Sequence, residues 1–187
     1  MYDDIKKAVE TLRSGGLILY PTDTSWRIGC DATNEKAVER ISKLKNAETA
    51  YPPLVLIDNP SKLQVYVDEV PDLTWDLIDL SDKPLTIIYQ KARSLARNLT
   101  GADGSIAIRV TNEAFSRRLC EQFRKPVVAV PATTKGETQP SNFKEISNEI
   151  KSTVDYIVHY RQSEQPKQTV SSIIKLGKGN LIEIIRE

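Results

Sequence analysis

The chain has 187 residues, of which 40% are hydrophobic and 27% are charged, and its formal net charge is +1. This composition is ordinary for a soluble globular protein, excludes a disordered chain, and gives no global electrostatic attraction to nucleic acid. Because the sequence shows neither a run of ~20 apolar residues nor the apolar core of a signal peptide, we expect a cytoplasmic protein without a membrane partner, folded as one domain over residues 1–187.

Helices alternate with short apolar strands along the sequence. Apolar residues recurring every three or four positions predict a helix over residues 3–14, which Gly15 and Gly16 end. A buried strand is expected over residues 17–20. In chain order, the same criteria then predict a helix from Asn34 to Lys45, a strand over 54–57, helices over 61–67 and 72–80, strands over 85–89 and 106–110, a helix over 112–123, a strand over 127–130, a helix over 143–152, and strands over 156–159, 172–176 and 181–185.

This order of elements predicts the fold class. Alternating helices and strands favour an α/β (α+β) fold, in which helices cover a β-sheet. The last two predicted strands are close in sequence and are joined by residues 177–180, which read Gly-Lys-Gly-Asn. We expect these two strands to be antiparallel, so that the sheet is mixed.

The two cysteines, Cys30 and Cys120, are far apart in the sequence and have no metal-ligand spacing. Without an export signal, buried free thiols are favoured over a disulfide. The sequence therefore predicts no protein-only metal site.

The segment Thr22-Asp23-Thr24 is the most informative part of the chain. It follows the first predicted strand and Pro21, so two hydroxyls and a carboxylate stand at the strand's carboxyl end, where open α/β sheets bind ligands. Proline fixes the direction in which the chain leaves the strand and removes an amide donor. The alternative is a local turn, in which these side chains hydrogen-bond their own backbone.

Several segments resemble the YrdC-like family, which comprises the threonylcarbamoyl-AMP synthases of tRNA modification and their relatives. The glycine pair, the first strand and the Thr-Asp-Thr turn are similar to the opening of that family. Further similar segments follow in the family's order over nearly the whole chain: Gly29-Cys30-Asp31-Ala32, a helix ending at Lys45, Lys83-Pro84-Leu85-Thr86, Ile106-Ala107-Ile108-Arg109-Val110, Ser171-Ser172-Ile173-Ile174 and Ile184-Ile185-Arg186. The resemblance implies a twisted mixed sheet, flanked by helices, with a concave ligand-binding face.

The resemblance also implies a reaction. ATP, L-threonine and bicarbonate would give threonylcarbamoyl-AMP and pyrophosphate, with Mg²⁺ arriving bound to ATP. Partner proteins of tRNA modification would then pass the threonylcarbamoyl group to adenosine in tRNA. Such a reaction needs cations around the phosphates and small polar groups around the amino acid.

The resemblance assigns site residues as well. It implies Lys45 and Arg109 as the catalytic residues, and a set of hydroxyl residues that bind substrate or nucleotide: Thr22, Thr24, Thr133, Ser171 and Ser172. Each of these residues also has a structural interpretation. A lysine at a helix C-terminus is favoured by the helix dipole alone. An arginine between apolar residues is either a surface residue of an edge strand or a buried salt-bridge partner, and serines at a strand start form turns.

The chain departs from the family pattern at four positions. An arginine of the family's Lys-x-Arg pair is replaced by Ala47, and its Ser-x-Asn pair is replaced by Pro131 and Thr133. Alanine cannot form the bidentate contacts that arginine makes with phosphate. Arg27 stands where the family usually has glycine. Either Arg27 and Lys135 restore the lost positive charge, or they fill the pocket.

Three functions therefore remain open at this point. The first is a synthase, with full or impaired activity. The second is a catalytically silent relative that binds a nucleotide, or binds tRNA or double-stranded RNA through basic residues at helical spacing: Lys91, Arg93, Arg97, Arg117, Arg118 and Arg124. The third is a scaffold whose site has been emptied.

Overall fold

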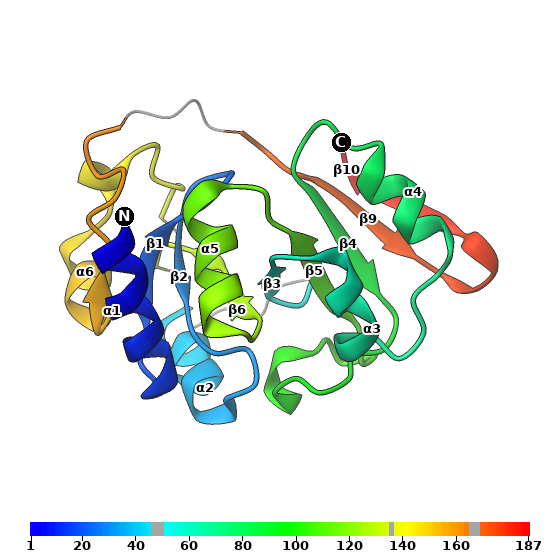
Figure 1. The fold of residues 1–187 in the computed structure, drawn as a ribbon, viewed down its shortest axis with the longest axis horizontal. Helices are drawn as coiled ribbons and strands as arrows, with labels where there is room; N and C mark the ends of the chain where they lie inside the picture. Colours follow the sequence, from blue (N-terminus) through cyan, green and yellow to red (C-terminus); the bar gives the residue numbers. More distant parts are fainter. Residues whose placement is uncertain (46–50, 135–136, 165–168) are drawn as a thin grey trace.

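Two β-sheets, of four and six strands, lie side by side in the computed structural model, which describes residues 1–45, 51–134, 137–164 and 169–187 (Figure 1). Both sheets contain parallel and antiparallel neighbours, so the predicted mixed α/β fold is confirmed. Within these ranges, no helix is both long and apolar enough to cross a lipid bilayer.

The four-stranded sheet contains β1 (Ile18–Pro21), β2 (Trp26–Gly29), β7 (Val130–Pro131) and β8 (Tyr156–Ile157), in the order β7-β2-β1-β8. β1 is antiparallel to β2 and parallel to β8, and β2 is antiparallel to β7. β2 was not predicted, because Arg27 interrupts its apolar pattern. Directly opposite residues of antiparallel strands share a face, so Arg27 lies on the same face as Tyr20 of β1.

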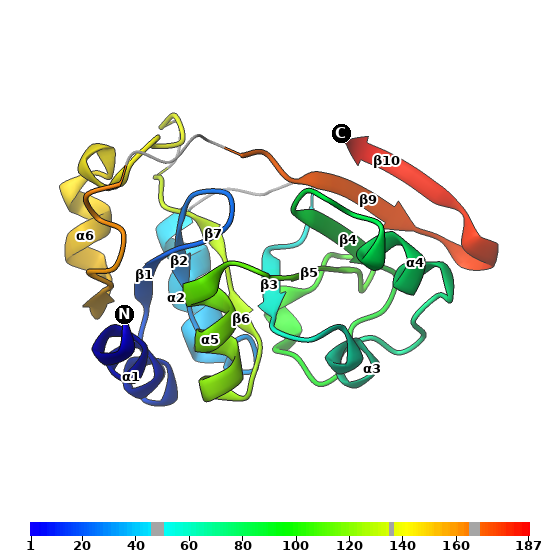
Figure 2. The ribbon, with the colours of Figure 1, turned by 45° about the horizontal axis from the view of Figure 1, so that its top comes forward.

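The six-stranded sheet contains β3 (Leu54–Ile57), β4 (Leu85–Tyr89), β5 (Ile106–Val110), β6 (Val127–Val128), β9 (Ser172–Leu176) and β10 (Ile182–Arg186), in the order β10-β9-β4-β5-β3-β6. β9 and β10 form the predicted antiparallel pair, which extends from the body of the molecule (Figure 2). The predicted strand over 127–130 is corrected to two short strands, since the chain passes from one sheet to the other at Ala129.

Six α-helices are found in the described part of the chain: α1 (Tyr2–Arg13), α2 (Glu35–Lys45), α3 (Leu63–Tyr66), α4 (Leu73–Asp79), α5 (Ala114–Phe123) and α6 (Asn148–Thr153). Four short 3₁₀ helices accompany them: η1 (Pro60–Lys62), η2 (Arg97–Leu99), η3 (Phe143–Glu145) and η4 (Lys178–Asn180). The helix predicted over 143–152 is therefore corrected to η3 followed by α6, which begins after the cap residue Ser147.

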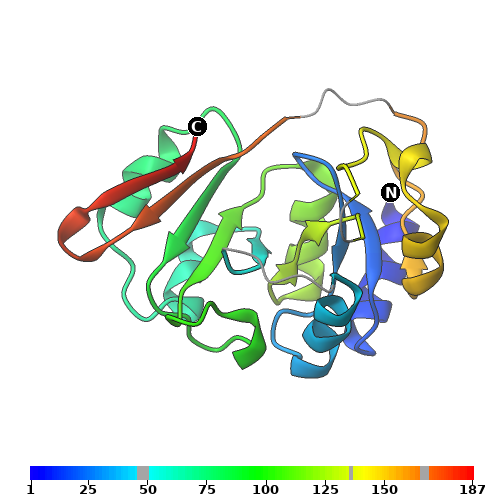
Figure 3. The ribbon, with the colours of Figure 1, turned by 180° about the vertical axis from the view of Figure 1, so that it is seen from behind.

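Helix α5 packs across the junction of the two sheets, against β1 of one and β3 of the other, with α1 beside it (Figure 1). The view from behind shows β9 and β10 at the opposite end of the molecule from α1 and α6 (Figure 3). The side chain of Asn34 accepts hydrogen bonds from the amides of Lys36 and Ala37, so the predicted cap of α2 is confirmed.

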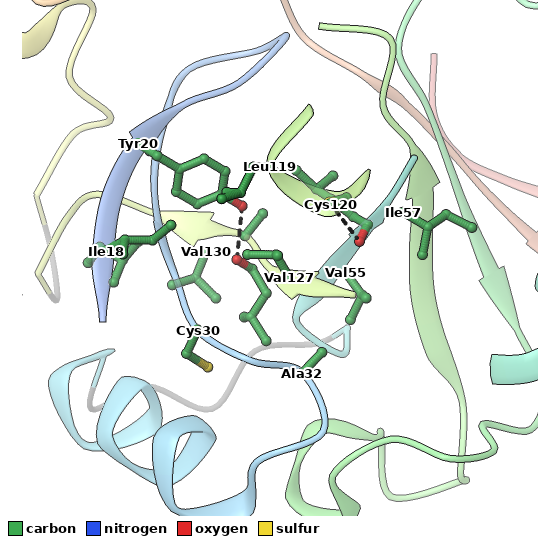
Figure 4. Packing of buried hydrophobic residues seen from close by; sticks show 14 of the residues in the cluster. Ile18, Tyr20, Cys30, Ala32, Val55, Ile57, Leu119, Cys120, Val127 and Val130 are labelled. Carbon is green, nitrogen blue, oxygen red and sulfur yellow. Dashed lines mark hydrogen bonds between the residues drawn. The ribbon is translucent and has the colours of Figure 1, made fainter. Parts of the chain in front are cut away.

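The core fills the space between α5 and the strands (Figure 4). Tyr20 is fully buried there, and its hydroxyl donates a 3.0 Å hydrogen bond to the carbonyl oxygen of Val128. Cys30 and Cys120 are both free and buried, as predicted. Burial raises the pKa of the Cys30 thiol to about 12, so this thiol stays neutral at physiological pH.

Candidate active site

The turn that follows β1 is stabilised by its own side chains. The Thr22 hydroxyl donates a 2.7 Å hydrogen bond to the Ser25 carbonyl oxygen and accepts weaker ones from the amides of Thr24 and Ser25. The local-turn interpretation of the Thr-Asp-Thr segment is therefore confirmed for Thr22. Both Thr22 and Thr24 are buried, and their hydroxyl oxygens lie 3.3 Å apart.

Asp23, between these threonines, joins the turn to the six-stranded sheet. Its carboxylate lies 2.6 Å from Nη1 of Arg109 on β5, whose side chain is only 2% exposed. Thr86 lies opposite Arg109 on β4, and its hydroxyl accepts hydrogen bonds of 3.1 and 2.9 Å from Nε and Nη2 of Arg109. A buried guanidinium needs such partners, because burial without them costs several kcal/mol.

Ser171 and Arg186 extend this network along β9 and β10. The Thr86 hydroxyl donates a long 3.5 Å hydrogen bond to Oγ of Ser171. Arg186 donates from Nε to the carbonyl oxygen of Ser171 and from Nη2 to its hydroxyl, both at 2.9 Å. Ser172 is the next residue, and successive strand residues point to opposite faces. Ser171 therefore joins the cluster, and Ser172 does not.

Lys45, the last residue of α2, contacts the segment that follows β7. Its ammonium donates hydrogen bonds to the carbonyl oxygens of Pro131 (2.9 Å) and Thr133 (2.6 Å) and to the hydroxyl of Thr133 (2.9 Å). Burial, with a smaller contribution from the positive charge of Arg27, lowers the pKa of Lys45 to about 8. Two residues predicted for the site, Lys45 and Thr133, are thus in direct contact.

Arg27, on β2, interacts electrostatically with both Arg109 and Lys45. Its Nη2 donates a 3.1 Å hydrogen bond to the hydroxyl of Thr24. Its Nε is shielded from solvent and has no hydrogen-bond partner in the described part of the chain, although part of the side chain stays accessible. Burial, followed by repulsion from Arg109, lowers the pKa of Arg27 to about 10.

The electrostatic balance of this cluster is positive. The cluster contains four cations: the charge of Arg27 interacts with those of Lys45, Arg109 and Arg186, and Arg109 also interacts with Arg186. Among the described residues, two carboxylates act on them, those of Asp23 and Glu137, so these six side chains carry a net charge of +2. Like charges held together in a partly buried site favour a negatively charged ligand. The arrangement is suited to holding an anion with more than one charge.

Arg161 holds the turn from the other side. It contacts the carbonyl oxygen of Thr22 at 3.4 Å and forms ion pairs with Glu113 at 3.3 Å and Glu164 at 2.6 Å. Its backbone has φ of +66°, a conformation that costs a non-glycine residue about 1 kcal/mol or more. Because two carboxylates pair with one guanidinium, Arg161, Glu113 and Glu164 together carry a net charge of −1.

Two cavities meet at Asp23. One, of about 130 Å³, is bounded by the turn, Trp26 and Arg161. The other, of about 240 Å³, is bounded by residues 81–85, Val110 and Asn112. A larger cavity of about 670 Å³ lies at the far ends of β4 and β9 and contains none of these site residues. The ring of Trp26 packs against that of Phe143, with ring centroids 4.8 Å apart. Trp26 is therefore a core residue.

Sequence reasoning did not assign Asp23, Thr86, Arg161 or Arg186 to the site. Asp23 belongs to the Thr-Asp-Thr turn, and Thr86 and Arg186 belong to segments that resemble the family. The sequence therefore contained these residues, but it did not show which side chains they contact. Two residues of the sequence argument, Ala47 and Lys135, lie outside the described residues. Within those residues, no three His, Cys, Asp or Glu side chains are grouped as metal ligands.

Known proteins resemble this chain in sequence and in fold. The sequence pattern of the Sua5/YciO/YrdC family, described as "Telomere recombination", matches residues 10–187. Threonylcarbamoyl-AMP synthase of Pseudoalteromonas translucida is 32% identical over 157 residues, which cover 82% of this chain and 84% of that protein. The synthase of Photobacterium profundum is 30% identical over 156 residues, which cover 79% of this chain and 82% of that protein.

Solved structures share the fold. Escherichia coli YciO superimposes with a TM-score of 0.83 at 25% identity, over 98% of this chain and 88% of that one. P. abyssi Sua5, in a crystal structure complexed with L-threonine, gives a TM-score of 0.80 at 25% identity, over 92% of this chain. This chain spans about half the length of that Sua5 chain, since the match covers 50% of it.

Proposed function

The chain belongs to the Sua5/YciO/YrdC family, and on that premise we propose that it is an enzyme of the threonylcarbamoyl-AMP synthase type, which makes threonylcarbamoyl-AMP and pyrophosphate from ATP, L-threonine and bicarbonate. The observation that carries this proposal is the cluster of four cations beside a turn of buried hydroxyls. A triphosphate requires the cations, and an amino acid requires small polar groups at a fixed distance from them.

All of the predicted site residues except Ser172 have a place in this proposal. Arg109 and Lys45 hold the phosphates, and Mg²⁺ arrives with the nucleotide, because a magnesium ion in such sites is held largely by substrate phosphates. Four of the hydroxyl residues orient the substrates: Thr22, Thr24, Thr133 and Ser171. Ser172 points to the opposite face of its strand and has no role in this proposal. P. abyssi Sua5 has been crystallised with L-threonine, which supports an amino-acid pocket in this chain beside Thr22 and Thr24.

The proposed chemistry balances without a further reactant. The amine of threonine combines with bicarbonate to give a carbamate and water. A carbamate oxygen then attacks the α-phosphorus of ATP, and pyrophosphate leaves with the electron pair of the broken P–O bond. The cations stabilise the charge that develops on pyrophosphate, which is the main protein contribution in phosphoryl-type transfers. Partner proteins would carry the product's threonylcarbamoyl group to tRNA.

Pyrophosphate release is the direct test of this activity. The wild-type protein is expected to release pyrophosphate only when ATP, L-threonine, bicarbonate and Mg²⁺ are all present. Arg109→Met should lower the rate at least a hundredfold, since removing one positioned donor costs roughly 10²–10³ in rate, whereas the exposed Arg117→Met on α5 should not. Release without threonine, or no release by a folded wild-type protein, would refute the proposal.

A silent, ligand-binding relative is the second candidate function, and the contacts of Lys45 favour it. An ammonium has three donors, and in Lys45 all three are occupied by the oxygens of Pro131 and Thr133. This candidate predicts nucleotide binding without turnover. It also allows binding of tRNA or double-stranded RNA, which should weaken steeply with salt; Lys91 and Arg117 are already paired with acidic residues.

Restoring the family pattern separates these candidates. The triple variant Ala47→Arg, Pro131→Ser and Thr133→Asn returns the missing arginine and the Ser-x-Asn pair. If the wild type is silent because of these changes, the triple variant should gain pyrophosphate release. If the wild type is already active, the triple variant should change its rate but not create the activity.

A further inference from the structure

Arg27 is a charged residue on a strand of the four-stranded sheet. Burying its charge destabilises the fold, so its presence there needs an explanation. We propose that Arg27 is a ligand-binding residue, the central cation of a subsite that takes a pyrophosphate or triphosphate group. The proposal deepens the proposed function and rests on it for the identity of the phosphate compound. The negative charge of the ligand, however, follows from the cations of the site alone.

The strand register aims Arg27 toward the other cations. Arg27 lies opposite Tyr20 of β1 and opposite Pro131 of β7, and these residues share one face of the four-stranded sheet. Trp26 and Ile28 alternate to the opposite face, where Trp26 packs against Phe143. The guanidinium of Arg27 therefore extends from the face of the sheet that carries Tyr20, and the charges of Arg109 and Lys45 act on it there. Lys45 is the last residue of α2, and Arg109 lies on β5.

Arg27 is the cation of this cluster with the most unused donors. Arginine carries five N–H groups, and in the described part of the chain only its Nη2 has a partner, the hydroxyl of Thr24. Lys45, by contrast, uses all three of its donors, and Arg109 is held by Asp23 and Thr86. A ligand that reaches this cluster meets free donors mainly on Arg27.

Without a neighbouring carboxylate, the charge of Arg27 lowers the stability of the ligand-free protein. Among the described residues, no carboxylate oxygen lies within 4.0 Å of its guanidinium, and Arg109 repels it. A partly buried charge without a partner destabilises a fold, and a well-packed apolar residue of similar size is often more stable there. Residues held at such a cost are typical of binding sites, where the ligand supplies the missing charge.

The number of charges decides the class of ligand. The cluster has a net charge of +2, so a single carboxylate would leave it positive. Pyrophosphate and the triphosphate of ATP carry enough negative charge to neutralise it, and their oxygens match the planar fork of a guanidinium. The structural alternative is that Arg27 fills the pocket. In that case its removal should open space for ligands and lower the stability of the fold.

Titration with inorganic tripolyphosphate tests the proposal. Calorimetry would compare the wild type with Arg27→Met, Arg27→Gln and the control Arg117→Met, whose arginine is exposed on α5. A hydrogen bond to a charged group contributes about 1.5–3 kcal/mol, so the Kd of both Arg27 variants should rise about tenfold to a hundredfold. The control should match the wild type. Without ligand, Arg27→Met should melt at a higher temperature than the wild type.

Several results would overturn the proposal. These are an Arg27→Met or Arg27→Gln protein that binds tripolyphosphate as tightly as the wild type, and a wild type that does not bind it at all. Circular dichroism would confirm that each variant is folded, and the glutamine variant serves if the methionine variant is not. Pyrophosphate release, measured in parallel, separates the two claims. Binding that depends on Arg27 in a protein without turnover refutes only the proposed function, and unchanged binding refutes only the role of Arg27.

Discussion

Asp23 and Arg109 are 86 residues apart in the sequence and form a 2.6 Å ion pair that joins the β1–β2 turn to β5. The pair fixes the turn of the four-stranded sheet against the six-stranded sheet, at the place where two cavities meet. It also leaves the surrounding cluster with more cations than carboxylates. The same contact thus supports the fold and neutralises one of the cations, so a ligand needs one negative charge fewer to balance the cluster.

Removing the Asp23 carboxylate should affect stability and binding in opposite directions. Asp23→Ala leaves the buried Arg109 without its anion, which should lower the free energy of unfolding by about 3 kcal/mol in urea titrations. The folded protein should nevertheless bind tripolyphosphate more tightly, because Arg109 gains free donors and the cluster gains one positive charge. Unchanged stability would show that the ion pair does not hold the sheets together, and weaker binding would show that Asp23 does not compete with the anion.

Thr86→Val should weaken the support of Arg109 without changing the size of the side chain. The Thr86 hydroxyl accepts two hydrogen bonds from Arg109, and a hydrogen bond to a charged group contributes about 1.5–3 kcal/mol. We expect a loss of about 2 kcal/mol in the free energy of unfolding, measured by urea denaturation. Thr153→Val, at an exposed position of α6, is the matched control and should change stability by less than about 0.5 kcal/mol. Equal effects of the two substitutions would contradict this account.

The affinity for anions should fall as the pH rises through about 8. The pKa of Lys45 is lowered to about 8 by burial and by Arg27, while Glu137 acts in the opposite direction. Above that pH, Lys45 loses the charge that attracts phosphate, so the Kd for tripolyphosphate should increase between pH 7 and pH 9. In Lys45→Met this increase should be absent. A wild-type Kd that is constant over this range would contradict the role of Lys45.

The same titration has the opposite sign for stability. The ordinary pKa of lysine is 10.5, so between about 8 and 10.5 the unfolded chain holds a proton on Lys45 that the folded protein has released. Stability therefore rises with pH over this window wherever Lys45 dominates. In Lys45→Met, the free energy of unfolding should show a smaller rise with pH between 8 and 10. An identical pH profile in both proteins would mean that Lys45 keeps its ordinary pKa.

Arg186→Met should weaken ligand binding with little effect on the fold. Arg186 lies on the exposed edge strand β10 and contacts Ser171, so its removal opens no cavity in the core. We expect the Kd for tripolyphosphate to rise at least severalfold while the midpoint of urea unfolding stays close to that of the wild type. A large loss of stability with unchanged affinity would assign Arg186 a purely structural role.

Local patterns in the sequence predicted most elements of this fold, but they could not predict the long-range pairings. Periodicity and caps located α1, α2 and α5, because these signals are contained in neighbouring residues. β2 was missed because Arg27, a charged residue, interrupts its apolar pattern. The two short strands around Ala129 were read as one, since a single apolar run reveals nothing about a change of sheet.

For the candidate site too, local patterns indicated residues but not their long-range contacts. The threonines of the turn, Lys45 and Arg109 were indicated by their motifs. Their partners were not, because the contact of Lys45 with Thr133 spans 88 residues and depends on how α2 ends beside β7. The unused donors of Arg27 were equally invisible, since they result from the register of three strands and the absence of a nearby carboxylate.

Incorporation of ¹³C-bicarbonate tests the central claim most directly. The wild-type protein would be incubated with ATP, L-threonine, Mg²⁺ and labelled bicarbonate, and the nucleotides would be analysed by mass spectrometry. The account predicts an AMP adduct that carries threonine and one ¹³C atom, formed together with pyrophosphate and strongly reduced in Arg109→Met. A folded wild-type protein that binds ATP but yields no labelled adduct would contradict it.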